Sequence, residues 1–117
     1  TLSCVLRVEG RWGGRAQRAL LVGDIEREQE LALVAARPEA LAAEVLLVPH
    51  HGSKTSSSEA FLDAVAPRVA LVQAGYRNRF GHPAPAVAAR YAARGIALVE
   101  SPRCGAWRFG PAGAQCW

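Results

Sequence analysis

Side chains that can ligate a metal ion or transfer a proton occur four times in stretches that follow short apolar segments. They are Asp24, His50, His51 and His82. Imidazole and carboxylate groups are ligands of zinc and manganese, and histidine is the commonest acid or base in catalysis. Ligands in α/β sheets bind beyond the carboxyl ends of the strands, so we expect these four side chains to share one edge.

Each of these residues also has a purely structural interpretation. An aspartate between a strand and a helix is often the helix N-cap, which would account for Asp24. Adjacent histidines can be surface or hydrogen-bonded side chains, and His82 precedes Pro83, which restricts the backbone before it. Residue type and position alone leave both interpretations open.

Residues 52–58 have the composition of an anion site. Gly52 allows close approach, Ser53 and Thr55 can donate hydrogen bonds, and Lys54 adds charge ahead of an expected helix start. The alternative is a flexible polar loop. The spacing of a phosphate-binding P-loop does not occur, which excludes that class of nucleotide site.

Residues 75–83 combine Arg77 and Arg79 with two aromatic side chains and His82. Arginine neutralises phosphate and aromatic rings stack on bases, so this stretch is a candidate contact for nucleic acid. The alternative is a glycine-bounded loop with a solvated face and one aromatic side chain in the core.

Basic charge is concentrated in the second half of the chain. The formal net charge is +4, and from residue 65 onward there are seven arginines against one acid, Glu100. Such an excess attracts polyanions. Composition bias explains it equally well, because thirteen of the fourteen basic residues are arginine.

The pattern of apolar residues predicts short strands that alternate with helices. We expect a hairpin first, then a helix over 25–36, a further helical turn over 39–43, and helices over 56–65 and 85–93, the last ended by Gly95. The strands are expected at 2–8, 19–22, 45–48, 69–73, 96–99 and 103–109. This order predicts an α/β layered fold.

No apolar run reaches the roughly 20 residues that span a bilayer, and no signal peptide opens the chain. The first residues have the character of a strand and lack an initiator methionine, which suggests an excised segment. Cys4, Cys104 and Cys116 lack metal-site spacing. They are expected to be buried thiols or to include one disulfide, Cys104–Cys116.

Three segments together resemble ComEC-type competence proteins. They read LLVGDIE at 20–26, VLLVPHHGSKTSS at 45–57 and AGYRNRFGHP at 74–83. Proteins of this family are inner-membrane channels for single-stranded DNA in natural transformation, and their soluble domain has the metallo-β-lactamase fold. The resemblance therefore implies that residues 1–117 form the C-terminal half of an αββα sandwich with a mixed sheet and flanking helices.

The resemblance also implies roles for individual residues. Asp24 matches a carboxylate that bridges two metal ions, manganese or zinc, and His50 rather than His51 matches the last metal-binding histidine. His51 and His82 would act on the substrate in a metal-dependent nuclease. The residues implied in binding DNA phosphates are Ser53, Lys54, Thr55, Arg77 and Arg79.

One departure from the family is large. The cluster of histidines and aspartates that supplies most of the metal ligands does not occur in this sequence. We therefore expect the intact domain to be a hydrolase that acts on DNA, without a small-molecule cofactor, and this segment alone to be inactive. The alternatives are a non-catalytic module that guides DNA through the same channel, and an unrelated small α/β binding domain. The implied location is a soluble domain on either face of the bacterial inner membrane.

Overall fold

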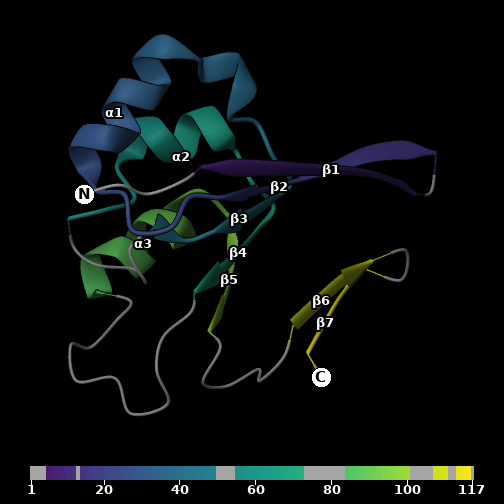
Figure 1. Cartoon of the computed structure of the whole chain (residues 1–117). Coiled ribbons are helices and arrows are strands. Elements are labelled where there is room, and N and C mark those ends of the chain that lie inside the picture. Colours follow the sequence, from purple (N-terminus) through teal and green to yellow (C-terminus); the bar gives the residue numbers. More distant parts are fainter. Residues whose placement is uncertain are drawn as a thin grey trace.

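The centre of the fold is a five-stranded mixed sheet with the strand order β1-β2-β3-β4-β5 (Figure 1). The computed structural model describes residues 5–12, 14–49, 55–72, 84–100, 107–110 and 113–116, with Trp12 and the last two ranges described by their backbone alone. β1 and β2 are antiparallel, and β2, β3, β4 and β5 are parallel. The expected α/β class is confirmed.

The opening hairpin is longer than its apolar residues predict. β1 is Leu6–Trp12 and β2 is Arg15–Leu21, with Trp12 opposite Arg15. Gly14 adopts a positive φ of 74°, which the tight turn between the two strands requires. The expected strand ends at 8 and 19 were therefore wrong, because cross-strand hydrogen bonds extend the ladder through polar residues. Figure 1 shows this hairpin projecting beyond the rest of the sheet.

Parallel strands must be joined by crossovers, and in this chain each crossover contains a helix. The helices are α1 (Arg27–Ala36), α2 (Glu59–Val65) and α3 (Pro85–Ala93), with a short 3-10 helix at Pro38–Ala40. The strands between them are β3 (Val45–Leu47), β4 (Val69–Val72) and β5 (Ala97–Glu100). α3 has the predicted bounds.

The local signals for helix ends hold in two further places. The Ser58 side chain accepts a hydrogen bond from the backbone N–H of Phe61, at 3.3 Å, and so caps α2, which begins at Glu59, three residues after the expected start at 56. Gly95 has a φ of 68° and follows the C-cap of α3. The helical turn expected at 39–43 is instead the 3-10 helix at Pro38–Ala40.

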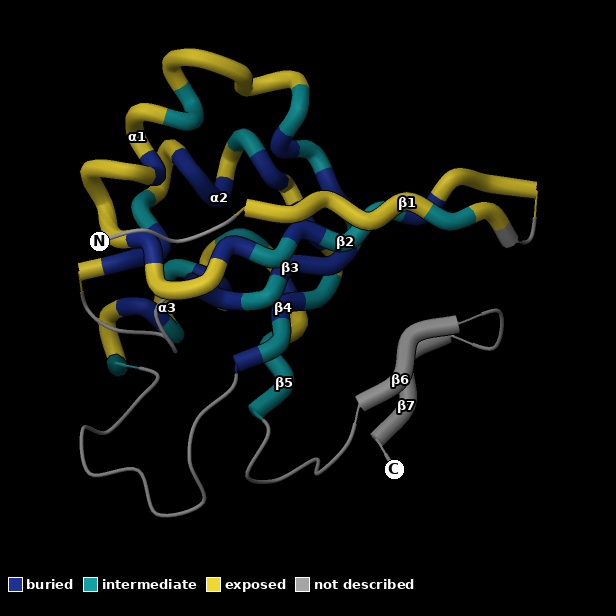
Figure 2. Tube along the Cα trace, in the orientation of Figure 1, coloured by how far each residue is buried: buried dark blue, intermediate teal, exposed yellow. Residues whose placement is uncertain are grey.

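The helices pack on one face of the sheet. Leu20, Leu46 and Ala70 lie side by side on three neighbouring strands and are almost completely buried. They share one apolar core with side chains of α2 and α3, including Phe61 and Val87. Figure 2 shows buried residues on these strands and on α2 and α3.

The opposite face of the sheet is also apolar. Two rows of side chains cross all five strands on that face, because cross-strand partners point to the same side. The first row is Val8, Ala19, Val45, Val69 and Ala97, and the second is Leu6, Leu21, Leu47, Leu71 and Val99. These residues lie outside the core formed with the helices, and Leu6 and Val8 are 55% and 50% exposed.

The C-terminal residues form a separate two-stranded antiparallel sheet, with β6 at Trp107–Gly110 and β7 at Gly113–Cys116. β6 overlaps the expected last strand at 107–109 and extends one residue further, to Gly110, and β7 was not predicted. Of the helices in the described ranges, none has the length and apolar character needed to cross a membrane.

Candidate functional site

Four parallel strands end at the same edge of the sheet. Leu21, Leu47 and Leu71 are in register across β2, β3 and β4. Asp24 follows Leu21 by three residues, and His50 follows Leu47 by the same interval. The stretch 73–83 begins directly after β4. The sequence-based expectation that these segments start from one edge is therefore supported by the strand register.

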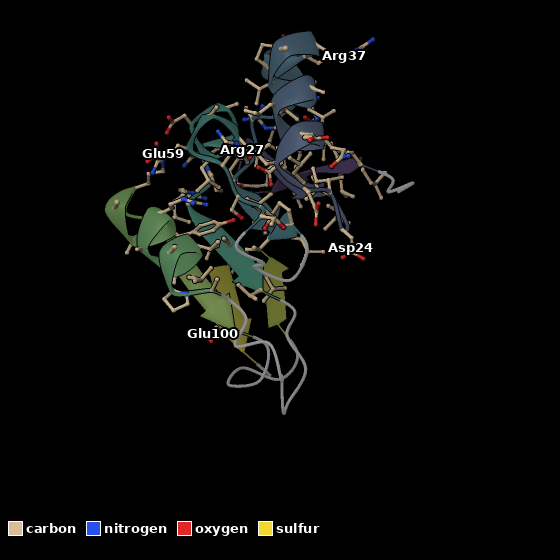
Figure 3. The ribbon with its side chains drawn as sticks, turned by 90° about the vertical axis from the view of Figure 1, so that its left-hand side faces the viewer. Asp24, Arg27, Arg37, Glu59 and Glu100 are labelled. Carbon is tan, nitrogen blue, oxygen red and sulfur yellow. The ribbon has the colours of Figure 1, made fainter. Side chains whose placement is uncertain are left out.

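Asp24 lies in a turn between β2 and α1, and its side chain is exposed. Figure 3 shows it pointing outward from the molecule. Asp24 is not the N-cap of α1, which is Glu26. The backbone N–H of Glu26 donates to Oε1 of Gln29 at 2.9 Å, which is half of a capping box. The interpretation of Asp24 as a helix cap is therefore wrong, and the helix begins two residues later than expected.

Most of the other candidate residues lie outside the described residues. They are His50, His51, Ser53, Lys54, Arg77, Arg79 and His82. The same holds for Cys4, Cys104 and the side chain of Cys116, so their proposed disulfide stays a prediction. The structure does describe the residues on both sides of 50–54, which are Pro49 and Thr55.

Thr55 is the one candidate phosphate-binding residue that the structure describes. Its hydroxyl donates to Oε1 of Glu26 at 3.2 Å, and its carbonyl accepts from the backbone N–H of Arg27 at 2.9 Å. Thr55 is thus attached to the start of α1, close to Asp24 in the sequence. Its contact with phosphate stays a prediction.

A buried carboxylate, which the sequence reasoning missed, holds the residues after Thr55. Glu30 of α1 is completely buried, and its two oxygens accept the backbone N–H groups of Ser57 and Ser58 at 2.6 and 2.7 Å. A sequence signal existed: Glu30 precedes Leu33 and Val34 by three and four residues, on the helix face that packs against the core. An acidic residue on an apolar helix face indicates a buried partner.

α3 completes this network from the other side. The Tyr91 hydroxyl and the Ser57 hydroxyl share a hydrogen bond of 2.9 Å. Burial raises the pKa of Tyr91 well above its ordinary value, although the Ser57 hydroxyl opposes the shift. Arg90 donates to the carbonyls of Ser56 and Ser57, at 3.2 Å each. The end of the candidate loop is thus held from α1 and from α3.

A groove of about 500 Å³ opens beside this network, on the helix side of the sheet. Arg27, Thr55, Ser58, Glu59 and Arg90 are among the residues that line it. Both charges are present, and Figure 3 labels Arg27 and Glu59 near the first turns of α1 and α2. Across the described ranges, no group of three or more metal-ligating side chains comes together.

The chain matches no protein-family model. It is 44% identical over 108 residues to competence protein ComA of Neisseria gonorrhoeae, which covers 92% of this chain and 15% of that protein. It is 42% identical over 64 residues to ComE operon protein 3 of Bacillus subtilis, covering 55% of this chain and 8% of that protein. Recombination protein 2 of Haemophilus influenzae is 38% identical over 81 residues, which are 69% of this chain and 9% of that protein. The chain thus spans less than a sixth of the length of these relatives, and the similarities point to the competence (ComEC) family.

Proposed function

We propose that the chain is part of a protein that takes up DNA in natural transformation. The observation that carries this proposal is the shared edge of β2, β3 and β4, from which the stretches containing Asp24, His50 and residues 75–83 depart. These same stretches carry the resemblance to competence proteins, and the similarity to one of them extends over 92% of the chain. Incoming DNA and the remainder of a membrane channel are the proposed partners.

The proposed architecture is the C-terminal half of a metallo-β-lactamase-like sandwich. The two apolar rows on the sheet face opposite the helices support it. Of these ten apolar side chains, Val45 is buried, most are partly exposed, and Leu6 and Val8 are at least half exposed, which leaves apolar surface in water at the β1 end of the face. A second sheet, supplied by further sequence of the same protein, would bury both rows between two helix layers.

The proposed activity of the intact domain is metal-dependent hydrolysis of a phosphodiester bond in DNA. Asp24 and His50 would hold divalent cations, manganese or zinc, with the remaining ligands outside the described residues. The exposed carboxylate of Asp24 at the strand edge fits this role, since an oxygen ligand must be accessible. Bound cations would activate water and stabilise the charge on the phosphate.

The other candidate residues divide into two groups in this proposal. His51 and His82 would contact the scissile phosphate or transfer a proton to the leaving oxygen. Ser53 and Lys54 would donate to phosphate oxygens, as would Arg77 and Arg79, and Thr55 would do so only after its hydroxyl leaves Glu26.

The test is Asp24→Asn in the full-length protein. Asparagine keeps the size of the side chain and removes the charge that a ligand shared by two cations needs. We expect loss of metal-dependent DNA cleavage and of one or more Mn²⁺ equivalents by calorimetry. The matched control is Asp63→Asn, because Asp63 is exposed on α2 and pairs with Arg94 at 2.9 Å, away from the strand edge.

Two results would redirect the proposal. Normal cleavage and normal metal content in the Asp24→Asn protein would exclude Asp24 as a ligand. The second result is DNA binding that weakens with salt, is unchanged by a chelator and occurs without cleavage. This result would favour the non-catalytic DNA-guiding module, which the excess of arginine from residue 65 onward also supports.

A further inference from the structure

The buried network around Glu30 has a geometry that suggests more than packing. Glu30 comes from α1, Ser57 and Ser58 come from the chain just before α2, and Tyr91 comes from α3. These three helices belong to three successive crossovers of the sheet. The network therefore fixes the chain before α2 relative to both neighbouring crossovers.

Two observations indicate that the network holds a conformation the chain would not adopt unaided. Ser57 has a φ of 58°, in the left-handed region that non-glycine residues avoid. Its backbone N–H and its hydroxyl are both bonded, to Glu30 and to Tyr91. Arg90 accompanies these bonds by donating to the carbonyls of Ser56 and Ser57. Strain that is held from several sides at one residue often marks a functional segment.

The same residues reach back to the end of β3. The Ser56 hydroxyl is buried and donates to the carbonyl of Pro49 at 3.0 Å. Pro49 is the last described residue before the stretch 50–54, and Thr55 is the first after it. The two ends of this stretch are thereby tied to each other and, through Ser57 and Ser58, to Glu30.

We propose that Glu30 is a positioning residue, whose buried carboxylate, assisted by Tyr91 and Arg90, fixes the described chain that flanks residues 50–54. This inference rests on the proposed function, because those residues include the candidate ligand His50. Glu30 does not touch the metal or the DNA. It acts through the backbone of Ser57 and Ser58.

The decisive variant is Glu30→Gln in the full-length protein. Glutamine has the same shape, but its amide NH₂ is a donor and cannot accept the second of two backbone N–H groups. One of Ser57 and Ser58 then loses its acceptor. Hydrogen exchange of the backbone amides in 55–58 is expected to accelerate at least about tenfold. Loss of groups that orient a metal ligand typically lowers metal affinity by about 10- to 100-fold, and we expect such a loss for Mn²⁺.

Glu44→Gln is the matched control, because Glu44 is also a carboxylate that accepts a backbone N–H, that of Arg18 at 2.7 Å. It lies before β3, at the opposite end of the strand from the candidate edge. This variant should destabilise the fold as a whole, so exchange at 55–58 should rise no more than at other core amides, and the affinity for Mn²⁺ should not change. If Glu30→Gln prevents folding, Tyr91→Phe is the milder variant, since it removes only the hydrogen bond to the Ser57 hydroxyl.

The outcomes separate this inference from the proposed function. Unchanged exchange at 55–58 in both the Glu30 and the Tyr91 variants would overturn the positioning role. Faster exchange at 55–58 with unchanged Mn²⁺ affinity would also overturn the positioning role, provided that Asp24→Asn abolishes Mn²⁺ binding in the same assay. If Asp24→Asn binds Mn²⁺ as the wild type does, the proposed function fails, and the exchange rates alone decide whether Glu30 fixes the segment.

Discussion

The ion pair between Arg18 and Glu44 predicts a pH-dependent contribution to stability that can be measured directly. Nη2 of Arg18 lies 3.0 Å from Oε2 of Glu44, and the Arg18 backbone N–H donates to Oε1 at 2.7 Å. The hydrogen bond from the Arg18 side chain lowers the pKa of Glu44 below its ordinary value of 4.5, and partial burial opposes this shift. The pair joins the middle of β2 to the residue directly before β3.

The expected loss in the free energy of unfolding follows from the contacts that Glu44→Gln removes. Glutamine still accepts the Arg18 backbone N–H, but it loses the charge and turns a donor toward the guanidinium. Hydrogen bonds to charged groups contribute about 1.5–3 kcal/mol. The two side chains are 31% and 20% exposed, so solvent screens part of the interaction. We therefore expect a loss of about 1–2 kcal/mol at pH 7, or roughly 4–8 °C in Tm for a chain of this size.

The sign of the pH dependence is fixed by the direction of the pKa shift. A carboxyl group whose pKa is lowered by folding stabilises the fold above its unfolded pKa and loses that contribution as pH falls through the folded pKa. The stability difference between the wild type and Glu44→Gln should thus be full at pH 6–7 and shrink below the ordinary pKa of about 4.5. Urea unfolding at several pH values measures it, with Glu39→Gln at an exposed position as the control. A difference that stays constant from pH 7 to pH 3 would refute the argument.

Three further predictions concern other parts of the chain. Gly95→Ala should cost about 1–2 kcal/mol in urea unfolding, because φ is 68° although nothing lies within 4 Å of an added Cβ; an unchanged midpoint would mean that the turn relaxes. Phe61→Ala should cost about 3–5 kcal/mol, since Phe61 is fully buried in the core; a loss below 1 kcal/mol would contradict its place there. Arg77→Ala and Arg79→Ala should each lower the salt slope of DNA affinity by about one unit in the full-length protein, and unchanged slopes would exclude this loop as the phosphate contact.

Helices whose first or last residues carry a strong start or stop signal were predictable from the sequence. α3 begins at Pro85, a residue suited to the first turn of a helix, and ends before Gly95, and its bounds were predicted correctly. The serines before Glu59 were expected to open α2 at 56, and the helix instead begins three residues later, with Ser58 as its cap. The start of α1 was misjudged because Ile25 looks helical, although its side chain is buried in the core before the helix begins.

The longer reach of the hairpin could not be predicted from apolar alternation. Residues 9–18 include Glu9, Arg11, Arg15 and Arg18, which a hydrophobic pattern assigns to a loop. Backbone pairing between two adjacent strands continues regardless of such side chains when both faces are exposed. For Glu30, the apolar helix face indicates burial, but the partners could not be predicted, because Ser57 and Tyr91 are distant in the sequence.

The sequence predicted that the segments after β2, β3 and β4 start from one edge of the sheet. It did not predict which side chains fix the chain near that edge. β3 is only three residues long, so its own backbone pairing provides few hydrogen bonds to fix the chain on either side. Glu44 attaches its amino end to Arg18, and Glu30 holds the segment beyond its carboxyl end. The two carboxylates hold the chain at both ends of this region, while Leu46 packs in the core beneath the helices and Val45 lies on the opposite face of the sheet. Apolar patterning therefore identifies the strand, and the two carboxylates account for how the chain is held before β3 and at Ser57 and Ser58.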